Sequence, residues 1–298
     1  MHALCTVPGA AGRGRGRPAL GVWSAPVENP TLRDVTARGV RMRVLEAGAG
    51  EPVVLVHGFL QSRLSWDAVA SELSRTRHVV APDLPGFGDS ERPAPERFRY
   101  GFDAFAESIA DLAAALELGR VAVAGHGLGA GIALTLAATH PHLVSRLVLV
   151  SPVVYPAREP LLVHVAGAPI VGGLVLQQAY GRAIFDRHVR AQIYGGARGD
   201  PHAELHYAAF NTPAARQAAL ATLVATRDTR PLVARVPRVS APTLVLWGRD
   251  DPGAHVAIGR RLARELAKGS LEVLECGRAP HEDDPRAVAR AMLAFLQA

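Results

Sequence analysis

The residues best placed to do chemistry lie in a glycine-rich segment, Val121-Ala-Val-Ala-Gly-His-Gly-Leu-Gly-Ala-Gly131. Its first residues have the apolar, β-branched character of a buried strand, and the glycines that follow permit a tight turn and a close backbone approach. A helix that begins near Leu128 would aim its positive dipole end at this turn. The segment therefore predicts a binding site for an oxygen or an anion, with the imidazole of His126 beside it.

Four further motifs follow the ends of expected strands and carry polar groups. The imidazoles of His57 and His281 and the carboxylate of Asp251 are groups that exchange protons in enzymes. The motifs are His57-Gly-Phe59, Pro82-Asp-Leu-Pro-Gly-Phe-Gly-Asp-Ser90, Leu246-Trp-Gly-Arg-Asp-Asp-Pro252 and Cys276-Gly-Arg-Ala-Pro-His-Glu-Asp-Asp-Pro285.

Strand and helix patterns alternate from about residue 40 onward, which predicts the α/β fold class with a largely parallel sheet. Several strand candidates are apolar at consecutive residues, as expected where helices cover both faces of a sheet. Helical spacing recurs between them, for example at Phe105, Ile109 and Leu112. The expected strands are residues 40–46, 53–57, 78–82, 121–125, 146–151, 243–248 and 271–276.

The alternation stops at Ser151-Pro152 and resumes near Arg238, which divides the chain into a core and an insertion. We expect residues 31–152 and 237–298 to form the α/β core, and residues 153–236 to form an inserted helical cap. Insertions at the carboxyl ends of strands often form the wall of a pocket. The Arg- and Gly-rich residues 1–30 are expected to form a disordered tail.

In this order and spacing, the five motifs resemble the α/β-hydrolase superfamily, in particular its capped esterase, C–C hydrolase and epoxide hydrolase branches. The resemblance covers about residues 35 to 298. It implies an α/β-hydrolase fold, in which helices flank a mostly parallel central sheet and a helical cap is inserted. It also implies a nucleophile at the glycine-rich elbow, an acid, a histidine base and an oxyanion hole made of backbone N–H groups.

The sequence departs from the family pattern at two of the three catalytic positions. The central residue of the elbow is Gly127, which has no side chain to attack a substrate. Arg278 occupies the position of the histidine base, and a guanidinium stays protonated at neutral pH. Asp251 alone keeps the expected residue type, at the position of the acid. Canonical ester hydrolysis is therefore expected to be absent or very weak.

Other residues could substitute for the missing base. His281 lies three residues beyond the base position and is expected at the start of the final helix, where we favour a structural role over general base catalysis. The same holds for His126, beside the elbow. Ser90 and Ser151 lie outside the elbow, so neither is expected to be a nucleophile.

The backbone groups of the site remain. By the resemblance, the N–H groups of Phe59 and Leu128 converge where a substrate oxygen would lie. Arg278 could add a positive charge there, or it could pair with Asp251, which is the arrangement we favour. The predicted ligand-binding residues are His57, Gly58, Phe59, His126 and Leu128.

Two functions remain open. The first is a protein with a degenerate triad that binds a small apolar molecule carrying a carbonyl or carboxylate group, or a protein partner. The second is a hydrolase, lyase or cyclase that uses Asp251, His281, His126 or an activated water in the same pocket. An assay of esters and epoxides on the wild-type chain distinguishes the two.

Composition restricts cofactors and location. Cys5 and Cys276 form no Cys-x-x-Cys pair, so no structural metal site is expected, and we expect Cys276 to be buried in the last strand. The pattern Gly125-x-Gly127-x-x-Ala130 resembles a dinucleotide fingerprint, but no acidic residue ends the next strand, so no cofactor is predicted. Without a signal peptide or an apolar run of membrane-spanning length, the expected location is the cytoplasm.

The net charge of +6 suggests nucleic acid as a partner, but the residue types argue against it. Lys268 is the single lysine among 33 lysines and arginines, which looks more like coding bias than selection for phosphate contacts. The segment Arg15-Gly-Arg-Pro18 resembles a minor-groove AT-hook, although such short basic motifs recur by chance. We therefore expect neither a nucleic acid nor a membrane partner, and the oligomeric state stays open.

Overall fold

The computed structural model describes residues 29–156, 181–192, 202–251 and 254–297. Their centre is an eight-stranded sheet with the order β1-β2-β4-β3-β5-β6-β7-β8. From β4 to β8 all neighbouring strands are parallel, while β2 is antiparallel to both β1 and β4. The strands are β1 (Thr31–Ala37), β2 (Val40–Ala47), β3 (Pro52–Val56), β4 (His78–Pro82), β5 (Val121–His126), β6 (Val144–Val150), β7 (Thr243–Gly248) and β8 (Gly269–Leu274).

The sequence patterns located seven of these strands, and β1 was missed. It is an edge strand whose first four residues are exposed, so its sequence lacks the consecutive apolar residues of a buried strand. A turn at Arg38 and Gly39, both with positive φ, returns the chain into β2. The expectation for Cys276 was wrong, because β8 ends at Leu274 and the thiol is only partly buried.

Helices cover both faces of the sheet and enclose two separate hydrophobic clusters. Side chains from α2, α3 and α10 fill one cluster, and side chains from α1 and α12 fill the other. The helices are α1 (Asp67–Leu73), α2 (Phe102–Ala115), α3 (Leu128–Thr139), α6 (Arg182–Gln192), α7 (Ala203–Phe210), α8 (Pro213–Thr226), α9 (Arg230–Arg235), α10 (Val256–Glu265), α11 (Pro280–Asp283) and α12 (Pro285–Gln297).

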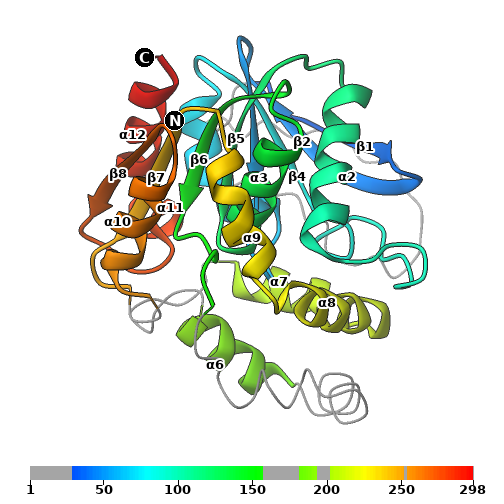
Figure 1. The fold of residues 1–298 in the computed structure, drawn as a ribbon. Coiled ribbons are helices and arrows are strands. Elements are labelled where there is room, and N and C mark those ends of the chain that lie inside the picture. Colours follow the sequence, from blue (N-terminus) through cyan, green and yellow to red (C-terminus); the bar gives the residue numbers. More distant parts are fainter. Residues whose placement is uncertain (1–28, 157–180, 193–201, 252–253, 298) are drawn as a thin grey trace, which may run out of the picture.

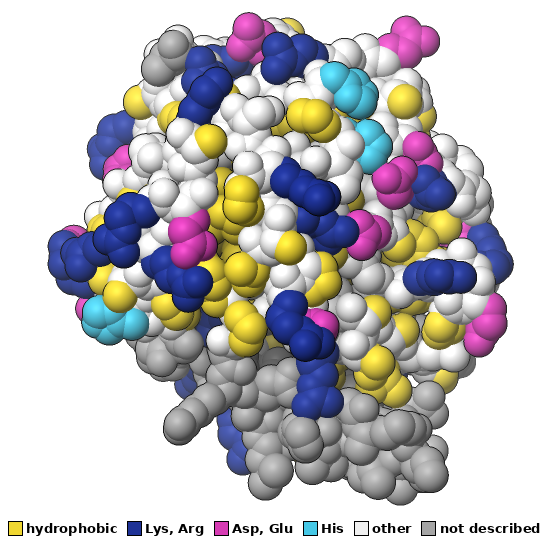
Figure 2. Space-filling model, viewed as in Figure 1, with side chains coloured by type: hydrophobic (Ala, Val, Ile, Leu, Met, Phe, Trp, Pro, Cys, Tyr) yellow, Lys and Arg dark blue, Asp and Glu magenta, His cyan; other side chains and the backbone are white. Residues whose placement is uncertain are grey.

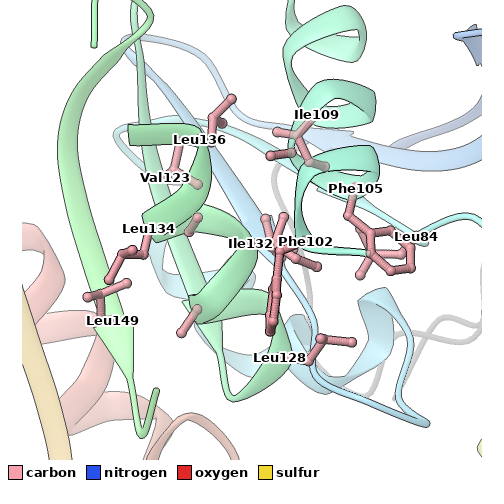
Figure 3. Packing of buried hydrophobic residues seen from close by; sticks show 14 of the residues in the cluster. Leu84, Phe102, Phe105, Ile109, Val123, Leu128, Ile132, Leu134, Leu136 and Leu149 are labelled. Atoms are coloured by element: carbon pink, nitrogen blue, oxygen red, sulfur yellow. The ribbon is translucent and has the colours of Figure 1, made fainter. Parts of the chain in front are cut away.

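The helix α3 is packed tightly between the sheet and α2. Its residues from Leu128 to Ala137 are all buried, as expected for a helix that is apolar on every side. Figure 3 shows Phe102 of α2 beside Ile132 of α3 in this cluster. At Gly131 an added Cβ would lie 2.6 Å from the Phe102 ring, so glycine permits the close contact between the two helices. This packing holds the first residue of α3, Leu128, directly after the glycine-rich turn.

Four described helices, α6 to α9, lie between β6 and β7 in the chain. In Figure 1, α6, α7 and α8 lie beyond the end of the sheet to which the β6 arrow points. These helices interrupt the alternation of strands and helices between β6 and β7, while the inserted cap and the division into core and cap at residues 152 and 237 stay predictions. None of the helices in the described ranges combines the length and apolar character that a bilayer crossing requires.

Candidate functional site

The glycine-rich turn is a sharp elbow between β5 and α3. Gly127 has φ 52° and ψ −109°, a conformation that side-chain-bearing residues rarely adopt. Its N–H donates to the Val150 carbonyl at 3.1 Å, and its own carbonyl accepts from the Gly131 N–H at 3.2 Å. An added Cβ at Gly127 would find no described atom within 4 Å. None of the residues in the described ranges therefore occupies the space into which a side chain at position 127 would project.

The two flanking glycines are required by close backbone contacts. A Cβ at Gly125 would lie 2.3 Å from the Gly129 carbonyl oxygen, and a Cβ at Gly129 would lie 2.3 Å from the Val56 oxygen. Either distance is far below a normal van der Waals contact, and backbone atoms cannot rotate away. Glycine at positions 125 and 129 thus lets α3 pack against β5 and β3. At position 127 no such close contact excludes a side chain.

The turn after β3 lies next to this elbow. The His57 ring donates from Nδ1 to the Gly58 carbonyl at 2.8 Å, and its Nε2 accepts from the Leu84 N–H at 3.0 Å. Burial lowers the pKa of His57 to about 4, so the ring is neutral and its tautomer is fixed by these two bonds. The N–H groups of Phe59 and Leu128 have no hydrogen-bond acceptor among the described residues.

A buried network connects this turn to the loop after β8. The Gln61 Oε1 atom accepts from the Gly58 N–H at 3.1 Å and from His126 Nδ1 at 3.0 Å, while Gln61 Nε2 donates to Glu282 at 2.8 Å. Burial, followed by the charge of Arg278, lowers the pKa of His126 to about 3. A neutral imidazole has one N–H, so we assign it to Nδ1, and Nε2 then only approaches the Arg278 carbonyl, at 3.3 Å.

His281 does not start the final helix as expected. It lies in α11, a single turn that precedes α12, because Pro285 begins a new helix. Its ring is 1% exposed and lies between Trp66 and His126, with centroid distances of 4.5 Å and 4.3 Å. Both ring nitrogens lack hydrogen-bond partners, and burial lowers the pKa of His281 well below its ordinary value. The ring is thus a neutral member of an aromatic stack.

Asp251 and Arg278 lie on two adjacent loops but do not pair. The Asp250 N–H donates to the Cys276 carbonyl at 3.0 Å, which holds the loops side by side. Asp251 is buried, and its Oδ1 accepts from the Ala254 N–H at 3.1 Å. No ion pair within 4.0 Å joins Asp251 to Arg278, so the pairing we favoured from the sequence is wrong. The half-buried Arg278 side chain contacts no carboxylate among the described residues.

Ser151 lies next to the elbow, although its position in the sequence did not predict this. It follows β6 directly, has φ 41° and is 2% exposed. Because His126 pairs with Val150 across the sheet, Ser151 lies beside Gly127. Its hydroxyl has no hydrogen-bond partner in the described part of the chain. Only the order of the strands in space reveals this neighbour, since Ser151 and Gly127 are far apart in the sequence.

Helix α7 contacts the core next to the turn that carries Phe59. Its His206 ring nitrogen lies 3.0 Å from the Ser62 hydroxyl, and His202 lies 3.2 Å from the Asp67 carboxylate. A small cavity separates α7 and α8 from this turn, and its wall is mostly apolar. The lining residues are Leu60, Gln61, Gly86, Phe87, Gly88, His206, Ala209, Phe210, Ala215 and Ala219.

Basic and acidic side chains are mixed on the face of the molecule that Figure 2 shows. The AT-hook-like residues 15–18 lie outside the described residues. Within the described ranges, no group of three or more His, Cys, Asp and Glu side chains could hold a metal ion.

The geometry is that of an α/β protein whose polar groups gather at a strand–turn–helix elbow. A family model for the alpha/beta hydrolase fold matches residues 51–285, so the chain belongs to the α/β-hydrolase family. The resemblance stated from the motifs is thereby confirmed, as is the fold class.

Among known proteins, two hydrolases from Pseudomonas are similar over most of their length. A 2-hydroxymuconate semialdehyde hydrolase from Pseudomonas sp. is 31% identical, over 85% of this chain and 90% of its own. A 2-hydroxy-6-oxo-2,4-heptadienoate hydrolase from Pseudomonas putida is 30% identical, over 89% and 96%. A solved serine hydrolase involved in carbazole degradation is 26% identical with a TM-score of 0.73, covering 90% of this chain and 99% of its own.

Proposed function

We propose that this chain binds a small, largely apolar molecule through a carbonyl or carboxylate group and does not hydrolyse esters by the serine mechanism. The observation that carries the proposal is Gly127, which keeps the backbone of an elbow while offering no nucleophile. The cation Arg278 stands where the general base is expected from the family pattern. A hydroxyl nucleophile without a base would be inactive, and here both are missing.

The binding half of the site supports this function. The unpaired N–H groups of Phe59 and Leu128 can donate to a substrate oxygen, as in an oxyanion hole. The first turn of α3, a 12-residue helix, adds its positive dipole end at the same place. The cavity between α7, α8 and the Phe59 turn has a mostly apolar wall, but its volume of about 10 Å³ is too small for a ligand body, so α7 and α8 would have to move outward to admit one. A predicted cap of α6 to α9 would then cover the ligand.

The relatives indicate the chemical class of the ligand. Their names describe hydrolysis of a semialdehyde and of a 6-oxo-heptadienoate, both compounds with a carbonyl group on an unsaturated chain. A descendant of such an enzyme that has lost its nucleophile could keep the affinity for the carbonyl compound. The ligand is therefore expected to be a small carbonyl compound with an apolar body.

An enzyme with other catalytic residues is the alternative. His126 and His281 are both neutral at pH 7 because burial lowers their pKa values, but the same lowered pKa values make both rings weak bases. Asp251 could orient a water molecule. The structure argues against an enzyme of this kind, because both ring nitrogens of His281 are buried and His126 Nδ1 is hydrogen-bonded to Gln61.

The test compares the wild type with Gly127→Ser/Arg278→His, using p-nitrophenyl butyrate, styrene oxide and a fluorophosphonate probe. We expect no turnover and no labelling of the wild type, and esterase activity with labelling at position 127 in the double variant. The control Gly119→Ser/Arg249→His changes a surface glycine with φ 63° and an exposed arginine, and should stay inactive. Hydrolysis by the wild type that Asp251→Ala abolishes would establish the alternative function instead.

A further inference from the structure

Arg278 is a cation without a counterion at the elbow. Its side chain is half-buried and makes no hydrogen bond or ion pair with a described residue. The backbone carbonyl of Arg278 lies 3.3 Å from His126, which precedes Gly127, and the charge of its guanidinium acts on the His126 ring. A partly desolvated guanidinium without a carboxylate partner is a binding group for an anion.

The nearby carboxylates are held by other donors. Asp251 accepts from the Ala254 N–H, Glu282 accepts from Gln61, and Asp283 accepts from the Gly277 N–H at 3.0 Å. These bonds keep the three acids in the turns around the site. The guanidinium of Arg278 is therefore available to an external anion.

A second, independent group lies beside the same elbow. The Ser151 hydroxyl is buried beside Gly127 and has no hydrogen-bond partner among the described residues. A buried hydroxyl that stays unpaired destabilises the folded chain, so a hydrogen-bond acceptor at this place would stabilise it. Ser151 can donate one hydrogen bond to a ligand oxygen. The positive φ of Ser151 adds backbone strain of the kind found at binding sites.

We infer that the group bound at the elbow is a carboxylate, which occupies the space that a side chain at position 127 would fill. One carboxylate oxygen accepts from the N–H groups of Phe59 and Leu128, and the other faces Arg278 and the Ser151 hydroxyl. The inference rests on the proposed binding function and narrows its ligand to the anion of a small carboxylic acid. A neutral ester or amide of the same shape lacks the charge that Arg278 recognises.

The experiment measures the binding of hexanoate and of hexanamide at pH 7.5 by calorimetry, because the two probes share one shape and differ in charge. Hexanoate should bind at least tenfold more tightly than hexanamide to the wild type. Arg278→Gln should remove that preference by weakening hexanoate alone, and Arg278→Lys should keep part of it. Ser151→Ala should weaken hexanoate several-fold. Arg249→Gln, which changes an exposed arginine, should alter neither affinity.

The outcomes separate this inference from the function on which it rests. If hexanoate and hexanamide bind equally and Arg278→Gln changes neither, the carboxylate inference is wrong while the binding function stands. If neither probe binds to the wild type, both are wrong. Circular dichroism of each variant verifies folding, and Arg278→Lys tests the charge should Arg278→Gln fail to fold.

Discussion

Replacing Gly127 by serine tests whether the elbow has room for a side chain. No described atom lies within 4 Å of the new Cβ, so the substitution creates no steric overlap with the described residues. The cost comes from the backbone, since a residue with a side chain at φ 52° and ψ −109° is strained by about 1–3 kcal/mol. Loss of glycine freedom in the unfolded chain returns about 0.4–1 kcal/mol. We expect Gly127→Ser to lower the free energy of unfolding by about 1–2 kcal/mol.

Gly129→Ala in the same motif is the matched comparison. Its Cβ would lie 2.3 Å from the Val56 oxygen and 2.5 Å from the His57 oxygen, both of them backbone atoms at the carboxyl end of β3. Relief requires α3 to move away from β3 and β5, which disturbs the buried cluster around the helix. The expected loss exceeds about 3 kcal/mol.

Urea unfolding at pH 7.5, followed by far-UV circular dichroism, measures both losses. The melting temperature of Gly127→Ser should fall by only about 2–8 °C, given about 2–4 °C per kcal/mol for domains of this size. A Gly127→Ser variant as unstable as Gly129→Ala would contradict this prediction, because the space above the elbow would then be filled. The prediction also fails if Gly127→Ser costs nothing, because the elbow backbone would then be unstrained.

Two further predictions concern buried charge and protonation. Arg63→Met should lower the free energy of unfolding by about 3–5 kcal/mol, because it leaves the fully buried Asp83 carboxylate without its ion pair, whereas Arg249→Met at the surface should cost under about 1 kcal/mol in the same urea titration. The neutral histidines of the site should make the fold acid-sensitive. The pKa values of His57 and His126 are lowered to about 4 and about 3 in the folded chain. Below pH 6.5 these two rings therefore bind protons in the unfolded chain but stay neutral in the folded chain. The free energy of unfolding therefore has its full value above about pH 7. It falls by about 1.4 kcal/mol per ring for each pH unit below the unfolded pKa. Urea midpoints that do not change between pH 7.5 and 5.5 would contradict this.

The strands could be predicted because their sequence signal is local. β4 and β7 have the predicted ends, since each is a run of apolar residues between polar turns. β1 has no such run, and it forms because β2 offers an open edge. We expected one final helix that begins near His281. Pro285 instead begins a separate helix, and a proline at this position is a sequence signal for such a break.

The side-chain contacts of the site could be predicted less well than the strands, because they depend less on local sequence signals. The glycine elbow and the histidine turn could be placed from their motifs, whereas the partners of each side chain are set by tertiary contacts. Ser151 becomes a neighbour of Gly127 only through strand order, and Arg278 does not form the ion pair with Asp251 that charge alone had suggested. Charge complementarity in a sequence identifies candidates for an ion pair, and geometry decides among them.

The geometry of the elbow and the chemistry of the elbow depend on different atoms. Close contacts at Gly125 and Gly129, with hydrogen bonds from Gly127 and Gly131, fix the turn through backbone atoms alone. Gln61 and Glu282 hold the opposing turn from the other side. None of these contacts uses a side chain at position 127, so a chain can lose its nucleophile without losing the donors that face a bound oxygen. Under the function we propose, substitutions at two positions replace catalysis by recognition on an unchanged backbone, and Arg278 is the group that we propose to give that recognition its preference for negative charge.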